Sequence, residues 1–339
     1  MTAKQVESTP KQETWKAFFV MGLLFPLHLI LGMVSLPVWM YYCAMGSRNA
    51  WLFTLFYLPF YLWPAQSQYP GWKGANGFWD WMQYAETGES YFGEFDVHGT
   101  ENVDKDQQYC VACHPHGTVI FQRTFWRSKL LDEVFKNPWR MIGASALYYI
   151  PIVRELTLWF GAVNATKETC EMLLRAGSSL VIYPGGLDEA NSTEGNGQDV
   201  RLKTRTGFIR LAVKHNTPVL PVFTFGELDC VDAVNALPST LSKWLKKTLR
   251  MSSTIFMGRF WTFIPYRVPF HMCIGKPIAV KHFPEESIES DAEVARIHAL
   301  YKAQLKSLYQ TNKKQFGYND RPLVFVCEEE EARKAKKHT

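Results

Sequence analysis

The feature that most constrains the fold is a long stretch near the N-terminus without charged side chains. About 31 residues between Lys16 and Arg48 include no Asp, Glu, Lys or Arg. A helix needs roughly 20 apolar residues to cross the hydrocarbon core of a bilayer, so this stretch is long enough. A second uncharged stretch, densest over residues 51–63, follows a polar break at residues 46–49. The pattern predicts a membrane-embedded helical hairpin over residues 17–66.

Two arrangements of this hairpin remain open: a full span followed by a partial one, or two helices that enter one leaflet and turn back. A buried hairpin in a soluble protein is disfavoured. A cleaved signal peptide is also disfavoured, because its apolar core covers only about 7–15 residues. Aromatic side chains that suit a membrane interface line both stretches. They are Trp15, Trp39, Tyr41, Tyr42, Trp51, Tyr57 and Trp63.

Beyond about Gly99 the pattern changes to short apolar runs that alternate with helical periodicity. The expected strands are Gln108–Cys113, Arg140–Gly143, Ser179–Tyr183, Pro218–Phe225 and His271–Gly275. The expected helices are Ile120–Phe135, Lys167–Ala176, Leu202–Lys214, Ser239–Leu249 and Asp291–Lys313. This alternation predicts an α/β domain with a mixed, mostly parallel sheet and flanking helices. The expected organisation is a polar tail (1–16), the hairpin (17–66), the α/β domain (67–327) and a charged tail (328–339).

Net charge and cysteine usage narrow the functional class. The formal net charge of +5 suits an anionic membrane surface or a phosphate-bearing substrate. It is too small to indicate nucleic-acid binding, and the chain carries no nucleic-acid motif. The seven cysteines are odd in number and scattered, which argues against a disulfide framework. Reduced thiols facing the cytosol are expected.

Three polar segments follow the ends of expected strands, at residues 114–117, 184–189 and 223–227. Ligands bind beyond the carboxyl ends of strands in open α/β sheets, so these segments are expected to converge on a site. In the first segment, His114 and His116 lie two residues apart and would face the same way in an extended chain. A histidine can take a proton from a hydroxyl group at neutral pH. The alternative is that one of the two histidines is only structural.

The second segment contains Gly185, Gly186 and Glu189. Glycines directly after a strand let backbone N–H groups face a ligand, as an oxyanion or phosphate site requires. Glu189 is a candidate for orienting a histidine, and a solvated loop carboxylate is the alternative. Further along, Lys203 and Arg205 are candidates for holding phosphate groups, although surface cations beside a helix would look the same.

The string Cys110-Val111-Ala112-Cys113-His114 matches the pattern for covalent haem attachment, and with His116 it suggests a zinc cluster. Two points argue against haem. Its attachment needs an exported, oxidising context, and the segment has the pattern of an apolar strand and not of a loop that opens a helix. Zinc would have four ligands crowded into seven residues of extended chain. Both alternatives are disfavoured, and no metal or cofactor is expected.

These segments together resemble the diacylglycerol acyltransferase type 2 family, which includes monoacylglycerol and wax-alcohol acyltransferases. The resemblance is carried, in order along the chain, by Tyr91-Phe92-Gly93, His114-Pro115-His116-Gly117, Pro151 with Arg154-Glu155, Gly185-Gly186 with Glu189, Arg205 with Gly207-Phe208, Leu220-Pro221-Val222-Phe223 and Phe225-Gly226-Glu227. It implies a glycerolipid-acyltransferase-like fold and substrate contacts at Tyr91, Phe92, Gly117 and Arg154.

The same resemblance implies transfer of an acyl group from acyl-CoA, a co-substrate, to diacylglycerol, giving triacylglycerol at the endoplasmic reticulum and lipid droplets. Monoacylglycerol or a fatty alcohol as acceptor, and a lipid-binding protein without turnover, remain alternatives. The expected partners are acyl-CoA, diacylglycerol and the phospholipid bilayer, with homo-oligomers possible. Soluble glycerolipid acyltransferases pair their histidine with an aspartate after four intervening residues, and in this chain Val119 and Phe121 occupy the corresponding places after His114 and His116. Glu189 is therefore the candidate partner.

The expected mechanism is direct transfer. His114 or His116 removes the proton of the acceptor hydroxyl, and amides near Gly117 or Gly185 receive the oxyanion. A covalent route through Cys113 is an alternative, but an apolar setting keeps a thiol protonated. Lysines three and four from the C-terminal end match a signal for retrieval to the endoplasmic reticulum. The basic, aromatic stretch 243–267 is expected on the bilayer surface.

Overall fold

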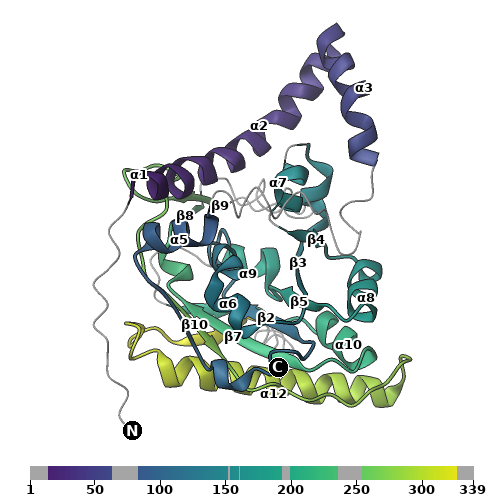
Figure 1. Ribbon diagram of the computed structural model, residues 1–339, viewed down its shortest axis with the longest axis vertical. Coiled ribbons are helices and arrows are strands. Elements are labelled where there is room, and N and C mark those ends of the chain that lie inside the picture. The colour runs from purple at the N-terminus through teal and green to yellow at the C-terminus, as the bar shows by residue number, and fades with distance from the viewer. Residues whose placement is uncertain are drawn as a thin grey trace, which may run out of the picture.

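The centre of the computed structural model is a seven-stranded sheet with the order β1-β10-β7-β2-β5-β3-β4 (Figure 1). The structure describes residues 14–62, 83–151, 153–159, 161–192, 199–235 and 254–326. The strands are β1 (Phe95–His98), β2 (Cys110–His114), β3 (Trp139–Gly143), β4 (Ala162–Asn164), β5 (Ser179–Ile182), β7 (Val219–Phe225) and β10 (Phe270–Ile274). Strands β7, β2, β5, β3 and β4 are parallel neighbours, whereas β10 is antiparallel to β7 and parallel to β1. The prediction of a mixed, mostly parallel sheet is confirmed.

The central strands are apolar along their whole length because helices or loops cover both faces of the sheet. Every residue of β2, β5 and β7 is buried. Alternate residues of β2 belong to two core clusters, with Cys110 and Ala112 in one and Val111 and Cys113 in the other. By the same alternation, His114 lies on the face of Cys110 and Ala112.

Helices α10 (Gly207–Lys214) and α12 (Ile288–Asn312) cover the face of the sheet that bears Cys110. Figure 1 shows α12 running beneath the sheet, beside β7 and α10. The other helical segments of the body are α5 (Tyr84–Phe92), η3 (Thr100–Asn102), η4 (Gln122–Arg127), α6 (Lys129–Val134), η5 (Ser145–Tyr149), α7 (Val153–Trp159), α8 (Lys167–Arg175), α9 (Gly186–Ser192) and η6 (Glu227–Asp229). The body also contains two small sheets among the described residues. One pairs the parallel strands β6 (Val200–Leu202) and β11 (Leu323–Phe325), and the other pairs the antiparallel strands β8 (Asp232–Asn235) and β9 (Thr254–Met257).

The N-terminal residues form a helical hairpin that projects from the body (Figure 1). Its elements are α1 (Trp15–Ala17), η1 (Phe18–Leu24), α2 (Phe25–Ala44) and α3 (Arg48–Leu62). The two long helices pack through Trp39, whose indole N–H donates to Thr54 Oγ1 at 2.9 Å and whose ring meets Phe53 edge-on. Within the described ranges, no helix combines the length and apolar character that a membrane crossing requires.

Large apolar side chains of this hairpin are exposed. They are Val34, Val38, Met40, Tyr41, Tyr42, Met45, Trp51, Leu52, Phe53, Leu55, Phe56, Leu58, Phe60 and Leu62. The first turns of the segment pack into the body, where Ala17 and Met21 are fully buried in a cluster with Tyr91 and Phe121. Exposed apolar side chains gathered on one projecting element are typical of an interaction surface.

Two predicted helices differ from the structure. The expected helix Ile120–Phe135 is divided into η4 and α6, because Ser128 is extended and its hydroxyl accepts from the amide of Leu131, starting a new helix. The expected helix Leu202–Lys214 begins only at Gly207, because Leu202 is the last residue of β6, which pairs with β11, and residues 203–206 link this strand to the helix. The expected strands and the helices at residues 167–176 and 291–313 are confirmed to within three residues.

Several sequence expectations lie wholly or partly outside the described residues. These are the tail 1–13, the uncharged stretch beyond residue 62, the helix 239–249, much of the basic stretch 243–267 and everything from residue 327 onward.

Candidate active site

His114 and Glu189 form a buried pair at the carboxyl ends of β2 and β5. His114 is the last residue of β2, and Glu189 lies in the first turn of α9, directly after β5. His114 Nδ1 lies 2.9 Å from Glu189 Oε2 and 3.2 Å from Oε1, and neither side chain is exposed. Because an ionised carboxylate can only accept, a neutral imidazole paired with it has its proton on Nδ1 and its lone pair on Nε2. The predicted convergence of the first two strand ends is therefore present.

Glu189 also holds the surrounding backbone. Its Oε1 accepts the amide of His116 at 2.5 Å, and its Oε2 accepts the amide of Lys203 at 3.0 Å. A Cβ atom on Gly185 would lie only 1.9 Å from Glu189 Oε2, so the carboxylate needs the space that this glycine leaves. Glu189 is thus a buried acceptor shared by three segments, and the alternative of a solvated loop carboxylate is wrong.

The surroundings of the two histidines differ. The His114 ring lies on the α12 side, 6.1 Å from the Tyr301 ring, while the half-buried His116 meets Tyr183 edge-on at 6.1 Å. The expectation that both side chains share one environment does not hold, because β2 ends at His114 and the chain beyond it is no longer a strand. His116 Nδ1 donates to the carbonyl of Gly117 at 2.9 Å. Burial lowers the pKa of His116, which favours its neutral form.

Two unpartnered polar atoms lie on the α12 side of this site. His114 Nε2 and the hydroxyl of Tyr301 are buried, and neither has a hydrogen-bond partner among the described residues. Their rings are neighbours, and burial raises the pKa of Tyr301 well above its ordinary value, with the charge of Glu189 acting in the same direction. A buried polar atom without a partner is unfavourable, so these atoms mark a place where a substrate group can be recognised.

Backbone amides beside the pair differ in their availability. The amide of Gly186 donates to the carbonyl of Tyr183 at 3.1 Å in a turn, so it is not available to an oxyanion. The amides of Gly117 and Gly185 have no acceptor within the described part of the chain. Gly117 has a φ of +65°, a conformation that glycine adopts more easily than other residues.

Glu227 supports the loop that follows His116. It lies directly after β7, is buried, and accepts the amides of Phe121 at 2.8 Å and Gln122 at 2.7 Å. A Cβ atom on Gly117 would lie 3.1 Å from Glu227 Oε1, so the third strand end also reaches the site. Burial raises the pKa of Glu227 to about 8, against the opposing effect of the two amides.

Gln122 completes this support, since its side-chain amide donates to the carbonyl of Pro115 at 2.7 Å and accepts from Thr224 at 2.7 Å. Sequence reasoning placed Glu227 in a segment expected to converge on the site but gave it no role, and it missed Gln122 and Tyr301. No sequence signal pointed to Tyr301, because it occupies an ordinary core position of α12.

The predicted phosphate-binding cations, Lys203 and Arg205, both lie beside Asp188. Arg205 Nη2 donates to Asp188 Oδ2 at 2.8 Å, and Lys203 Nζ lies 3.8 Å from the same oxygen. The Arg205 guanidinium lies 3.7 Å from a Cβ built on Gly186. Asp188 therefore offsets part of the positive charge that an incoming phosphate would meet.

Three predicted substrate-binding residues lie elsewhere. Tyr91 and Phe92 are in the aromatic cluster of Phe121 and Phe270, and the Tyr91 hydroxyl donates to the carbonyl of Pro265 at 2.6 Å. Arg154 in α7 is buried and donates to Glu155 at 2.7 Å. These positions place Tyr91 and Phe92 in the core and Arg154 at the base of the hairpin, away from the His114–Glu189 contact.

The cysteines of the Cys-x-x-Cys-His string face different core clusters, Cys110 on one side of β2 and Cys113 on the other. They therefore cannot ligate one metal ion. Burial also raises the pKa of Cys113 well above its ordinary value, so this thiol is protonated and is a poor nucleophile.

A buried histidine held by a carboxylate thus lies at the carboxyl ends of parallel strands, where ligands bind in open α/β sheets. The chain belongs to the diacylglycerol acyltransferase family, whose sequence model matches residues 44–326. It is an acyltransferase of lipid biosynthesis, as the resemblance predicted.

Relatives in this family act on different acceptors. The chain is 28% identical to acyl-CoA wax alcohol acyltransferase 2 of Mus musculus, over 67% of this chain and 72% of that one. It is 29% identical to 2-acylglycerol O-acyltransferase 3 of Homo sapiens, over 64% and 68%. It is 24% identical to diacylglycerol O-acyltransferase 2 of Mus musculus, over 88% and 79%.

Among solved structures, the chain is similar to the 1-acyl-sn-glycerophosphate acyltransferase PlsC from Thermotoga maritima. The TM-score is 0.41 and the sequence identity 18%, over 83% of this chain and 97% of that one. This similarity is too weak to carry an argument, and the family assignment rests on the sequence match.

Proposed function

We propose that the protein transfers an acyl group from acyl-CoA to diacylglycerol, with His114 as the general base. The observation that carries the proposal is the buried His114–Glu189 pair, in which Nδ1 is held by the carboxylate and Nε2 is buried without a partner. A carboxylate at Nδ1 fixes the tautomer and stabilises the imidazolium that forms when Nε2 accepts a proton. No carboxylate in the described part of the chain contacts the ring of the half-buried His116, which supports His114 over His116.

In the proposed reaction, His114 Nε2 takes the proton of the acceptor hydroxyl as its oxygen attacks the thioester carbonyl carbon. The carbonyl π electrons move to oxygen, and the amides of Gly117 and Gly185 donate to this oxyanion. Collapse of the tetrahedral intermediate breaks the carbon–sulfur bond. The departing CoA sulfur takes the proton back from His114, leaving the ester product and CoA thiol.

Lys203 and Arg205 are the proposed contacts for the phosphates of acyl-CoA. Arg205 lies beside Gly186, and the backbone amide of Lys203 donates to Glu189. Phosphate is a stronger partner for arginine than a partly exposed carboxylate, so an incoming phosphate would replace Asp188 at Arg205.

Diacylglycerol is the proposed acceptor because the mouse diacylglycerol O-acyltransferase 2 aligns over 88% of this chain, against 67% for the wax alcohol enzyme. The exposed apolar hairpin supports a position at a lipid bilayer, and we propose the endoplasmic reticulum membrane, where a lipid acceptor is at hand. In this arrangement acyl-CoA arrives from water and the acceptor from the membrane.

The test is an assay of the purified full chain with labelled acyl-CoA and diacylglycerol, monoacylglycerol or a fatty alcohol in separate reactions. We expect triacylglycerol as the main product. His114→Ala should lower kcat by about 100- to 10,000-fold, the contribution of a general base. His116→Ala should lower it less, and Cys113→Ala should leave most activity.

The result that would reverse the assignment of the base is a larger loss for His116→Ala than for His114→Ala in folded variants. Loss of activity in Cys113→Ala alone would point to a covalent route instead. A chain that binds acyl-CoA but forms no ester with any of the three acceptors would be a lipid-binding protein.

A further inference from the structure

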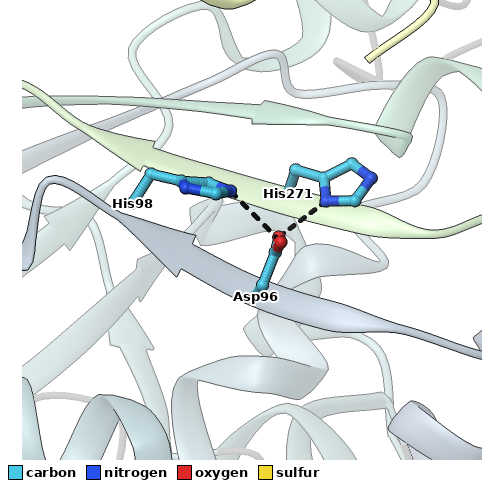
Figure 2. Close-up of side chains that lie close together, drawn as sticks. All are labelled: Asp96, His98 and His271. Carbon is cyan, nitrogen blue, oxygen red and sulfur yellow. Dashed lines mark hydrogen bonds and ion pairs between the residues drawn. The ribbon is translucent and has the colours of Figure 1, made fainter. Parts of the chain in front are cut away.

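Asp96, His98 and His271 bring three ligand-type side chains together on β1 and β10 (Figure 2). Asp96 and His271 are partners in the register of the two parallel strands. His98 lies two residues after Asp96 on β1, so its side chain points to the same face of the sheet. Asp96 Oδ1 lies 2.6 Å from His271 Nδ1, and Oδ2 lies 3.1 Å from His98 Nε2.

The spacing of these atoms is close to what a small divalent ion requires. One ligand atom from each residue lies within 4.8 Å of the other two. Around zinc, with bonds of about 2.0–2.2 Å, ligand atoms in tetrahedral geometry are roughly 3.3 Å apart. The two printed contacts of the carboxylate, 2.6 and 3.1 Å, are slightly shorter than this separation, and the 4.8 Å limit for the set is longer, so modest side-chain adjustments would bring the three ligand atoms around one ion.

The surroundings hold this cluster in place and leave it accessible. The His271 side chain is 14% exposed and stacks on Phe316, with ring centroids 4.1 Å apart and planes at 12°. The His98 ring lies 5.3 Å from the same phenylalanine. The side chains of Asp96 and His98 are each 37% exposed, so an ion can enter and water can complete its coordination.

The partners of Asp96 favour a metal site over a simple ion-pair network. Among the described residues, the Asp96 carboxylate contacts the two imidazoles, and no lysine or arginine pairs with it. Two imidazoles with one carboxylate form a ligand set that suits Zn²⁺ and neighbouring transition metals. Strand β1 is also the last strand at its edge of the sheet, with β10 as its neighbour.

We propose that Asp96, His98 and His271 bind one divalent transition-metal ion, Zn²⁺ foremost, which joins edge strand β1 to β10. The site lies on the same face of the sheet as His114, but β7 and β10 separate β1 from β2. It is independent of the proposed acyl transfer. Spacing along the sequence could not reveal it, because its ligands come from segments far apart in the chain.

The test uses the full chain, purified in detergent with a tag that contains no histidine and treated with a chelator. Titration with ZnCl₂ followed by calorimetry is expected to give one bound ion per chain and a higher temperature of unfolding. Asp96→Asn and His271→Ala should each weaken binding at least about 100-fold, since loss of even an outer-shell partner weakens metal sites by 10- to 100-fold. His282→Ala, which removes an exposed histidine outside the cluster, is the matched control and should bind as the unchanged chain does.

Cobalt provides a readout that does not depend on stability, because Co²⁺ bound by protein ligands absorbs visible light. The unchanged chain should develop this absorption with one equivalent of Co²⁺, and the Asp96→Asn and His98→Ala variants should not. Circular dichroism would establish that each variant is folded. The proposal is overturned if the unchanged chain binds no Zn²⁺ at micromolar concentration, or if folded cluster variants bind it as tightly as the control.

Discussion

At the scale of single residues, Gly185 determines whether the His114–Glu189 pair can form. A methyl group at this position would overlap Glu189 Oε2, which lies 1.9 Å from the Cβ site. Gly185→Ala must therefore displace the carboxylate from His114. We expect kcat to fall by about 100-fold or more, measured with labelled acyl-CoA and diacylglycerol, because the base loses its orienting partner.

Gly207→Ala is the matched control for this change. A Cβ atom there meets nothing within 4 Å, and the residue begins α10, so alanine should leave both activity and folding nearly unchanged. Equal activities for the two variants would mean that Glu189 does not act through His114.

Glu227 provides a test by pH. Its pKa in the folded chain is about 8 and its ordinary value is 4.5, so between these values the folded chain holds a proton that the unfolded chain releases. This proton stabilises the folded chain fully below about pH 4.5, and the stabilisation is lost as the pH rises towards 8. The total loss of folding free energy is on the order of a few kcal/mol. Glu227→Gln should flatten the dependence of the unfolding temperature on pH between 5 and 8. If the unfolding temperature of this variant changed with pH as steeply as that of the unchanged chain, groups other than Glu227 would be responsible.

The sequence predicted the chemistry of the site better than its geometry. His114 and Glu189 were recognisable because both follow apolar strands, and the carboxyl ends of neighbouring parallel strands meet. The different surroundings of His114 and His116 were not predictable, since they depend on where β2 ends. Tyr91 and Arg154 belong to the family pattern, yet they pack in the core and at the hairpin base, a distinction that only tertiary contacts reveal.

At the scale of elements, apolar runs located the central strands, whose residues are buried on both faces. Strands β1 and β4 were missed because they are short and lie at the sheet edges, where the composition is less apolar. The helix at 120–135 was predicted as continuous because its apolar periodicity continues through Ser128. The hydroxyl of Ser128 caps the start of α6 and so ends the preceding helical segment, an effect that the spacing of apolar residues does not reveal.

The α2–α3 hairpin is predicted to hold the protein on a bilayer. Leu55 and Phe56 are 66% and 70% exposed, and each should contribute about 1.5–3 kcal/mol on burial in lipid. Leu55→Asn with Phe56→Asn should therefore weaken binding to phosphatidylcholine vesicles by roughly 100-fold or more, measured by flotation. Ile288→Asn on α12 also removes an exposed apolar side chain and should not change vesicle binding. Similar losses in both variants would exclude a specific role of the hairpin.

At the scale of the whole molecule, a short polar chain joins the hairpin to the body. The Tyr57 hydroxyl of α3 donates to Glu155 Oε2 at 2.6 Å, and the buried Arg154 donates to Glu155 Oε1 at 2.7 Å. Glu155→Gln should lower stability by on the order of 2–3 kcal/mol, less than for a fully buried pair, because Glu155 is 27% exposed. Tyr57→Phe should lower it by about 1 kcal/mol. Thermal unfolding in detergent measures both.

The junction should matter most when the acceptor lies in a bilayer, since the hairpin then sets how the body faces the lipid. We expect Glu155→Gln to lower turnover of diacylglycerol in vesicles more than in mixed micelles, where the acceptor is less oriented. Equal decreases in the two systems would show that the junction serves stability alone.

The bonds of Glu189 also have a consequence for synthesis of the protein. Its carboxylate, which α9 carries after β5, is held by groups from two other segments: His114 and His116 at the end of β2, and Lys203 after β6. A nascent chain that has not yet brought these segments together has no oriented base. Newly made chains should therefore be unable to consume acyl-CoA until the sheet is assembled.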